Sequence, residues 1–407
     1  MSAPDIAVTG LGMLTPAGAG TDATWRRVCE GGSTVAATSP ALVGMPVDFC
    51  ASVGEIDIGV VGRRNVYRQD RFVQFVLVAA HEALADAGLT AAEWDADRVG
   101  VVIGCGMGGV ATWEKQHARL LGHGPERVSP LLIPMMTPNS AAGELALAFG
   151  ARGPGSVVCT ACASGATAIA VARDLLASGR CDIVIAGGTE AAITPLTVAA
   201  FANLGTLSQR RGNPGAASRP FDIDRDGFVM SEGAAVLVLE RAEHAVARGR
   251  RPSVLLAGCG AASDAHHATA AHPEGRGARQ ALRSALRDAD LVAGDVDHVN
   301  AHGTSTVLND EVEAAVIGDL LPHGPQVTST KGVLGHMLGA AGAVEAALTV
   351  LAIQQSTVPP TANLESPGPG GELNLVSKTA SRLPVRAALS NSFGFGGHNV
   401  VLAFRHA

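Results

Sequence analysis

Short apolar runs alternate with helical patterns along the whole chain. Between residues 71 and 88, apolar side chains such as Phe72, Phe75 and Val76 recur at three- and four-residue steps, which predicts a helix with one buried face. Further helices are predicted at 140–150, 163–178, 277–290, 310–321 and 337–354. Strands are predicted at 5–12, 98–104, 157–158, 182–188, 234–240, 253–258, 297–301, 326–329, 387–390 and 399–404.

The two parts of the chain follow the same order of elements. Short apolar strands that alternate with helices predict buried, largely parallel sheets covered by helices. We therefore predict an α/β fold built from two similar βαβαβαββ halves, residues 1–250 and 251–407. The polar segment 209–233 and the Pro- and Gly-rich segment 356–374 are predicted to be long loops, which are often functional in compact folds.

Composition narrows the class of protein. The chain has 407 residues, 47% of them hydrophobic, which is enough to form a large hydrophobic core and two domains. A net charge of −7 gives no support for a nucleic-acid partner. The seven cysteines lack a disulfide spacing, which favours a reducing cytoplasm. The start of the chain does not look like a signal peptide, and no window of ~18 apolar residues predicts a membrane span.

The segment 157–165, Val-Val-Cys-Thr-Ala-Cys-Ala-Ser-Gly, is predicted to turn from a buried strand into a helix. Cys162 would then lie at the first turn of the helix, where free N–H groups and a partial positive charge favour the nucleophilic thiolate. Cys162 could instead be a small core residue. A redox pair with Cys159 also remains open, although Cys159 is expected to lie inside the strand; a zinc site would need a second cysteine pair.

Three loops of the second half carry unusual polar content: 300–306, 329–336 and 390–399. His302 and His336 could each be an ordinary loop histidine or a catalytic group. His336 is expected at a helix start, where the dipole would keep the ring neutral and able to donate to an oxygen that gains negative charge. The glycine-rich third loop could be a tight turn or could present backbone N–H groups to an oxyanion.

Four segments together resemble the signature blocks of the β-ketoacyl-acyl-carrier-protein synthases, in the order found in that family: 160–165, 300–306, 329–336 and 391–397. The resemblance extends over essentially the whole chain. It implies the thiolase fold, in a five-layered α/β/α/β/α arrangement. It also implies an acyltransferase of fatty acid or type II polyketide synthesis, which condenses a cysteine-bound acyl chain with malonyl-acyl-carrier protein and releases CO2. No cofactor is implied, since the carrier's phosphopantetheine holds the substrates.

The same resemblance implies a role for individual residues. Cys162 would accept the acyl chain, His302 and His336 would form the histidine pair, and the backbone N–H groups of Cys162 and Phe395 would form the oxyanion hole, with Phe395 also the gate. The supporting residues, which could equally make ordinary structural contacts, would be Lys331, Asp310, Glu313 and Glu345. The pantetheine arm, the acyl pocket and a gating loop would involve Thr304, Thr306, Met107, Met135, Phe201, Asp264 and Thr269.

The implied partner is an acidic acyl-carrier protein, so docking would need a local basic patch on this acidic chain. The candidates, which could also form an ordinary solvated face, are Arg63, Arg64, Arg68, Arg127 and Arg210. A homodimer or a heterodimer with a chain-length factor is expected. A non-catalytic chain-length subunit and a coenzyme A-dependent thiolase-type enzyme remain as alternatives. A metal site at Asp264, His266 and His267 is not favoured, because adjacent histidines seldom point together.

Overall fold

The computed structural model describes residues 4–36, 42–56, 59, 62, 66–90, 94–368 and 372–407. Within this part of the chain, an 11-stranded sheet has the order β4-β3-β5-β6-β1-β7-β13-β12-β8-β9, with β2 beside β1, and β10 pairs with β11. The strands are β1 Ile6–Thr15, β2 Gly18–Ala19, β3 Val99–Gly104, β4 Gly155–Val158, β5 Ile183–Glu190, β6 Gly233–Arg241, β7 Val254–Ser263, β8 His298–Asn300, β9 Gln326–Thr328, β10 Thr357–Val358, β11 Ser381–Arg382, β12 Ala387–Gly394 and β13 His398–His406.

The helices lie between these strands in chain order. The α-helices are α1 Thr21–Glu30, α3 Arg71–Ala87, α4 Val110–His123, α5 Leu132–Met136, α6 Ser140–Phe149, α7 Ser164–Ala177, α8 Pro195–Asn203, α9 Ala242–Ala247, α10 Arg276–Asp288, α11 Val307–Leu320, α12 Lys331–Leu334 and α13 Ala341–Gln355. Short 3₁₀ turns are η2 Val66–Arg68, η3 Ala96–Arg98, η4 Pro125–Arg127, η5 Pro214–Ala216, η6 Ala293–Asp295 and η7 Leu338–Ala340.

The sheet repeats one topology in both halves of the chain. The order β4-β3-β5-β6-β1 in the first half corresponds strand by strand to β9-β8-β12-β13-β7 in the second. The directions agree as well, since β3–β5 and β8–β12 are parallel while β5–β6 and β12–β13 are antiparallel. The halves meet where the start of β1 pairs with the start of β7. The predicted duplication is therefore present in the structure.

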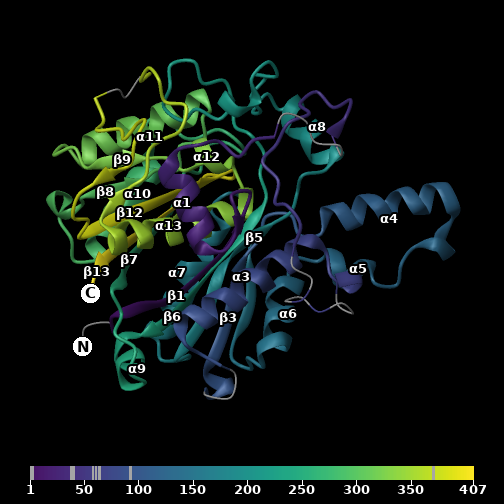
Figure 1. Ribbon diagram of the computed structural model, residues 1–407, viewed down its shortest axis with the longest axis horizontal. Coiled ribbons are helices and arrows are strands. Elements are labelled where there is room, and N and C mark those ends of the chain that lie inside the picture. The colour runs from purple at the N-terminus through teal and green to yellow at the C-terminus, as the bar shows by residue number, and fades with distance from the viewer. Residues whose placement is uncertain are drawn as a thin grey trace.

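Helices form the layers around the two halves of the sheet (Figure 1). On the first half, α3 contacts β1, β5 and β6 and packs against α6; on the second half, α10 contacts β7 and β13 and packs against α11. Between the halves, α7 and α13 contact each other, and α13 also contacts β6 and β12. Every residue of α13 from Ala341 to Ile353 is buried, as expected for a helix in the middle layer.

One helical stretch has the length and hydropathy of a membrane span, although the sequence pattern predicted none. It covers Leu338–Gln355, and 89% of it is buried inside the protein. The central layer explains this composition, because a helix that is covered on all sides needs no polar face.

One expectation for the first half is wrong, and one helix there was not predicted. The strand at 157–158 is not buried: β4 lies at the end of the sheet, pairs with β3 alone among the described strands, and leaves Cys159 exposed. The helix α4 was not predicted, and it projects with α5 from the rest of the molecule (Figure 1). Its apolar side chains, Val110, Trp113, Leu120 and Leu121, recur at helical spacing, but none is buried, and its one buried residue is the polar Gln116.

Candidate active site

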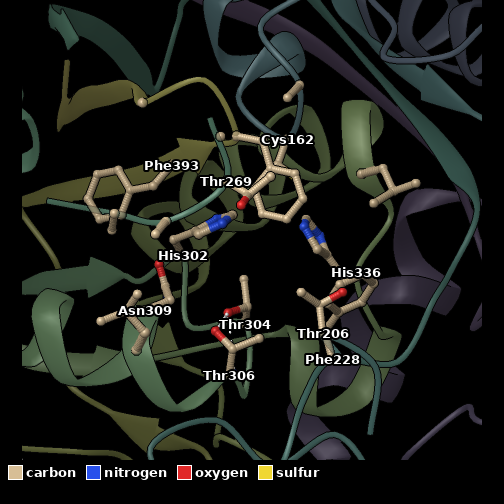
Figure 2. A pocket seen from close by; sticks show the side chains of 18 of the residues that line it. Cys162, Thr206, Phe228, Thr269, His302, Thr304, Thr306, Asn309, His336 and Phe393 are labelled. Atoms are coloured by element: carbon tan, nitrogen blue, oxygen red, sulfur yellow. Dashed lines mark hydrogen bonds between the residues drawn. The ribbon is translucent and has the colours of Figure 1, made fainter. Parts of the chain in front are cut away.

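A cavity of about 520 Å³ brings the predicted reactive groups together. Cys162, His302, His336 and Phe395 all line it, and they come from loops that follow β4, β8, α12 and β12. Figure 2 shows the two imidazole rings on opposite sides of the space beside Cys162. The structure therefore places four predicted residues, far apart in the sequence, in one site.

Cys162 lies in a tight turn just before α7. Ala161 has a φ of 50°, which is unusual for a residue with a side chain, and Ala163 N donates to Thr160 O at 3.1 Å. The end of β12 packs directly against this turn: a Cβ on Gly394 would lie 2.4 Å from Thr160 O. Glycine is required there, because only a bare backbone allows β12 to approach the turn that carries the thiol.

The protonation state of Cys162 differs from the expectation. Burial raises the pKa of the thiol to about 12, although the Lys331 ammonium and the backbone N–H of Phe395 both act to lower it. The start of the helix therefore does not produce a resting thiolate, because loss of solvation outweighs the favourable charges. The same Phe395 N–H lies close to the sulfur, where an oxyanion hole was predicted.

The two histidines form a buried, neutral pair. Their ring centroids are 5.5 Å apart, with an angle of 83° between the ring planes. Burial lowers the pKa of both rings well below the usual value, and the positive charge of Lys331 lowers both further. His336 was predicted to be neutral because of the dipole at a helix start. It does not lie at the start of an α-helix, since α12 ends at Leu334 and α13 begins only at Ala341, so burial is the main cause of its neutrality.

Lys331 determines which nitrogen of His302 carries the proton. Its Nζ lies 3.3 Å from His302 Nδ1 and also contacts the carboxylate of Glu345. An ammonium group only donates, so Nδ1 accepts and the ring proton remains on Nε2. Burial raises the pKa of Glu345 to about 7, while the neighbouring ammonium opposes that rise.

Glu313 and Asp310 hold the loop that follows β8. Glu313 accepts from His302 N at 2.8 Å and Gly303 N at 2.7 Å, and Asp310 accepts from Ser305 N at 3.2 Å. Neither carboxylate lines the cavity. Both act on the backbone that carries His302 and Thr304, which agrees with the structural contacts considered from the sequence.

The predicted pantetheine residues lie at one side of the cavity. The hydroxyl oxygens of Thr304 and Thr306 are 2.8 Å apart, and Asn309 lies beside them (Figure 2). α11 begins at Val307, about one turn before the start at 310 that the sequence pattern predicted. The two hydroxyls are available for hydrogen bonds with an elongated polar substrate.

Aromatic and sulfur-containing side chains also line the cavity. Met107 and Phe201 line the cavity, and the rings of Phe201 and Phe395 lie 6.4 Å apart. Met135 does not line the cavity of this chain and lies in α5. Phe228, to which the sequence pattern assigned no role, packs its ring 5.3 Å from that of His336.

The predicted gating loop is hydrogen-bonded to the turn that carries Phe395. Asp264 and Thr269 line the cavity, and Asp264 accepts from Gly277 N at 3.1 Å and from Asn399 Nδ2 at 3.0 Å. Gly396 N donates to Ala268 O at 2.7 Å. No cluster of three or more metal-ligating side chains occurs among the residues that the structure describes.

The predicted docking arginines are only partly described. Arg63 and Arg64 lie outside the described residues. Arg68 and Arg127 are exposed in η2 and η4, whereas Arg210 is half-buried and donates to Asp224 O at 2.7 Å. A docking role for these arginines stays a prediction.

The comparisons with known proteins agree with this site. Models of the N-terminal and C-terminal domains of β-ketoacyl synthases match residues 3–245 and 254–365. The 3-oxoacyl-[acyl-carrier-protein] synthase 2 of Synechocystis sp. is 45% identical over 405 residues, which are 98% of this chain and 97% of that protein.

Two solved structures are similar along their full lengths. A ketosynthase in complex with its type II polyketide acyl-carrier protein, bound to a hexaketide, is 32% identical with a TM-score of 0.92, over 100% of both chains. The ishigamide ketosynthase/chain length factor is 30% identical with a TM-score of 0.91, over 100% of both chains. The two matching family models and the full-length relatives show that this chain belongs to the β-ketoacyl synthase family and has its thiolase fold.

Proposed function

We propose that this chain condenses an acyl group held on Cys162 with malonyl-acyl-carrier protein, which yields 3-oxoacyl-acyl-carrier protein and CO2. The observation that carries the proposal is the shared cavity, in which a buried thiol faces two imidazoles that burial and Lys331 keep neutral. Family membership supports the same reaction class.

The first half-reaction is a thioester exchange. The Cys162 sulfur attacks the acyl thioester of the carrier, its bond to the acyl carbon forms, and the carrier's sulfur leaves and takes up a proton. Because the resting group is a thiol, its proton departs as the bond forms and passes to the leaving sulfur of the carrier. The N–H groups of Cys162 and Phe395 stabilise the tetrahedral oxyanion.

The second half-reaction begins when malonyl-carrier protein enters the emptied site. Loss of CO2 leaves an enolate, whose oxygen accepts hydrogen bonds from His302 and His336. The carbanion attacks the Cys162 thioester, the new carbon–carbon bond forms and the thiol is released. This sequence of steps is ping-pong, and no cofactor takes part in it.

The same proposal covers partners and location. The pantetheine arm would pass Thr304 and Thr306, and the carrier would dock near the basic residues Arg68 and Arg127. The exposed edge of β4 and the exposed Leu121 and Ile133 on the projecting region favour a dimer, since an unpaired apolar edge seldom stays uncovered. The seven cysteines lack a disulfide spacing, which favours the cytoplasm.

Intact-mass measurement after incubation with an acyl-carrier thioester tests the proposal. We expect an acyl adduct on the wild type and none on Cys162→Ala. A non-catalytic chain-length subunit would give no adduct on either protein. An adduct that survives the Cys162→Ala substitution would refute the assignment of the nucleophile.

A further inference from the structure

Glu190 is a buried carboxylate in the cavity wall that the proposed reaction does not use. It ends β5, has 0% of its surface exposed and lines the same cavity as Cys162 and Met107. A carboxylate is rarely buried without a cation beside it. In the described part of the chain, the hydrogen-bond partners of Glu190 are backbone N–H groups and one thiol, and none is a cation.

The carboxylate joins two segments that have no other hydrogen bond to each other in the described structure. Its Oε2 accepts from Gly106 N at 2.8 Å and from Gly339 N at 3.1 Å, while Oε1 accepts from Met107 N at 3.1 Å. The packing is tight on both sides, because a Cβ on either glycine would lie 2.6 Å from Oε2. The Glu190 side chain therefore links two segments that also pack directly against each other, since a Cβ on Gly339 would lie 2.5 Å from Gly106 N.

The first of these segments adjoins the nucleophile. β3 and β4 are paired, so the residues that follow them lie side by side, and the Cys159 thiol donates to Gly106 O at 3.5 Å. Met107 then projects into the cavity that Cys162 lines. An acyl chain on Cys162 would therefore meet a wall whose position depends on Glu190.

His336 has its own supports. The backbone N–H of His336 donates to Val229 O at 2.8 Å, and its backbone carbonyl accepts from Ser231 N at 3.0 Å. These bonds do not involve the Gly339 segment, so loss of the Glu190 contacts leaves the histidine in place. The malonyl half-reaction should then be separable from any change in the acyl wall.

We propose that Glu190 is a positioning residue for acyl-chain selectivity, in that it holds the Gly106–Met107 wall against Gly339. This inference rests on the proposed function. Burial raises the pKa of Glu190 to about 7, although the backbone N–H groups and the Cys105 thiol that donate to it act to lower the pKa. Glutamine at this position can keep only part of the contacts, because its NH2 group would face N–H donors.

Acylation of Cys162 by short and long saturated acyl-carrier thioesters tests the inference, with intact mass as the readout. We expect Glu190→Gln to change the ratio of the long-chain to the short-chain acylation rate about fivefold or more. Malonyl-carrier decarboxylation should stay within about twofold of wild type, because His336 is held separately. Glu190→Asp keeps the charge but is too short to hold both segments, so it should change the ratio in the same direction.

Glu240→Gln is the matched control. Glu240 is an equally buried strand-end glutamate, but it does not line the cavity, and its substitution should leave the chain-length ratio unchanged. An unchanged ratio in both Glu190 variants overturns the inference, as does equal loss of acylation and decarboxylation or failure of both variants to fold. A wild-type enzyme that is never acylated on Cys162 would instead refute the proposed function.

Discussion

Lys331 Nζ lies 3.3 Å from Nδ1 of His302, and the same ammonium group is ion-paired with Glu345. All three side chains are buried. The ammonium leaves Nε2 as the protonated nitrogen of His302, and its charge opposes formation of an imidazolium. One lysine thus sets both the tautomer and the neutrality of a proposed catalytic ring.

Replacement of Lys331 should therefore change the pH dependence of the reaction. In Lys331→Met the pKa of His302 rises relative to wild type, because the neighbouring cation is lost while burial remains. The acid side of the malonyl decarboxylation profile should move to higher pH. We also expect a loss of about 3–5 kcal/mol in the free energy of unfolding, since the Glu345 carboxyl loses its partner.

The rate of CO2 release between about pH 5 and about pH 8 checks this prediction. Lys331→Arg keeps the positive charge and serves as the control, so its profile should lie closer to wild type. A uniform loss of rate at every pH, with no shift of the acid side, would show that the lysine has only a structural role.

The histidine pair should act in only one half of the reaction. His302→Ala or His336→Ala removes a donor to the enolate oxygen, so decarboxylation should fall about 10²–10³-fold. Acyl loading of Cys162 should be far less affected, because its oxyanion contacts are backbone groups. Stopped-flow decarboxylation and intact-mass loading measure the two halves separately.

His298 provides a control for this comparison. It is equally buried, its pKa is lowered to about 4 by burial, and it does not line the cavity. His298→Gln should leave both half-reactions near their wild-type rates. Equal loss of loading and decarboxylation in the His302 and His336 variants would contradict the roles proposed for them.

Local signals in the sequence explain why most elements were predictable. The helix predicted at 71–88 is observed at Arg71–Ala87. Its start is fixed by the Asp70 side chain, which accepts from Phe72 N, and its end by Gly88, whose φ of 64° suits glycine. Each of these determinants lies within a few residues of the boundary that it sets.

The wrong predictions depend on contacts that no local pattern contains. The strand that precedes Cys162 looked buried from Val157 and Val158, but burial depends on its place in the sheet, and β4 is an edge strand. The helix α4 is a different case, because Trp113, Leu120 and Leu121 recur at helical spacing and were a local signal that could have revealed it.

In the site too, local motifs were predictable from the sequence, whereas features that depend on distant contacts were not. The motifs placed Cys162 and both histidines in one cavity correctly, but the state of the thiol depends on burial by many distant residues. The sequence pattern did not identify Glu190 as a site residue, because its hydrogen-bond partners lie far away along the chain, at 105–107 and 339. An acidic residue that closes an apolar strand was the one available signal.

Thr304 and Thr306 should act on binding of the carrier's arm rather than on chemistry. Thr304→Val keeps the shape of the side chain and removes its hydroxyl, so one hydrogen bond worth about 1 kcal/mol is lost. We expect KM for the acyl-carrier thioester to rise about fivefold, with kcat within about twofold. Steady-state kinetics with a short acyl thioester that lacks the arm should show no such change.

Thr349→Val is the matched control, because Thr349 is buried, bonds to Glu345 O and does not line the cavity. It should leave KM unchanged. A fall in kcat without a change in KM in the Thr304 variant would place the hydroxyl in the chemical step instead.

Glu240 should make stability depend on pH in the acid range. Burial alone would raise its pKa, but hydrogen bonds from Arg248, Thr9 and His244 bring the pKa below the ordinary value. A carboxylate with a lowered pKa stabilises the fold above its unfolded pKa of about 4.3, and this contribution is lost as the pH falls through the folded pKa. The stabilisation is therefore fully present at neutral pH.

Urea unfolding of wild type and Glu240→Gln at about pH 7 and about pH 4 measures this contribution. We expect a loss of about 3 kcal/mol at neutral pH, because Arg248 is left without its acidic partner, and a smaller difference at acid pH. Glu243→Gln, in the helix α9 that follows β6, is the control. The Glu243 side chain is 76% exposed, so its ion pair with Arg241 should contribute little to the free energy of unfolding at either pH. If the difference in the free energy of unfolding between wild type and Glu240→Gln is equal at both pH values, the pKa of Glu240 does not change on folding. The hydrogen bonds from Arg248 and His244 would then not favour its charged form.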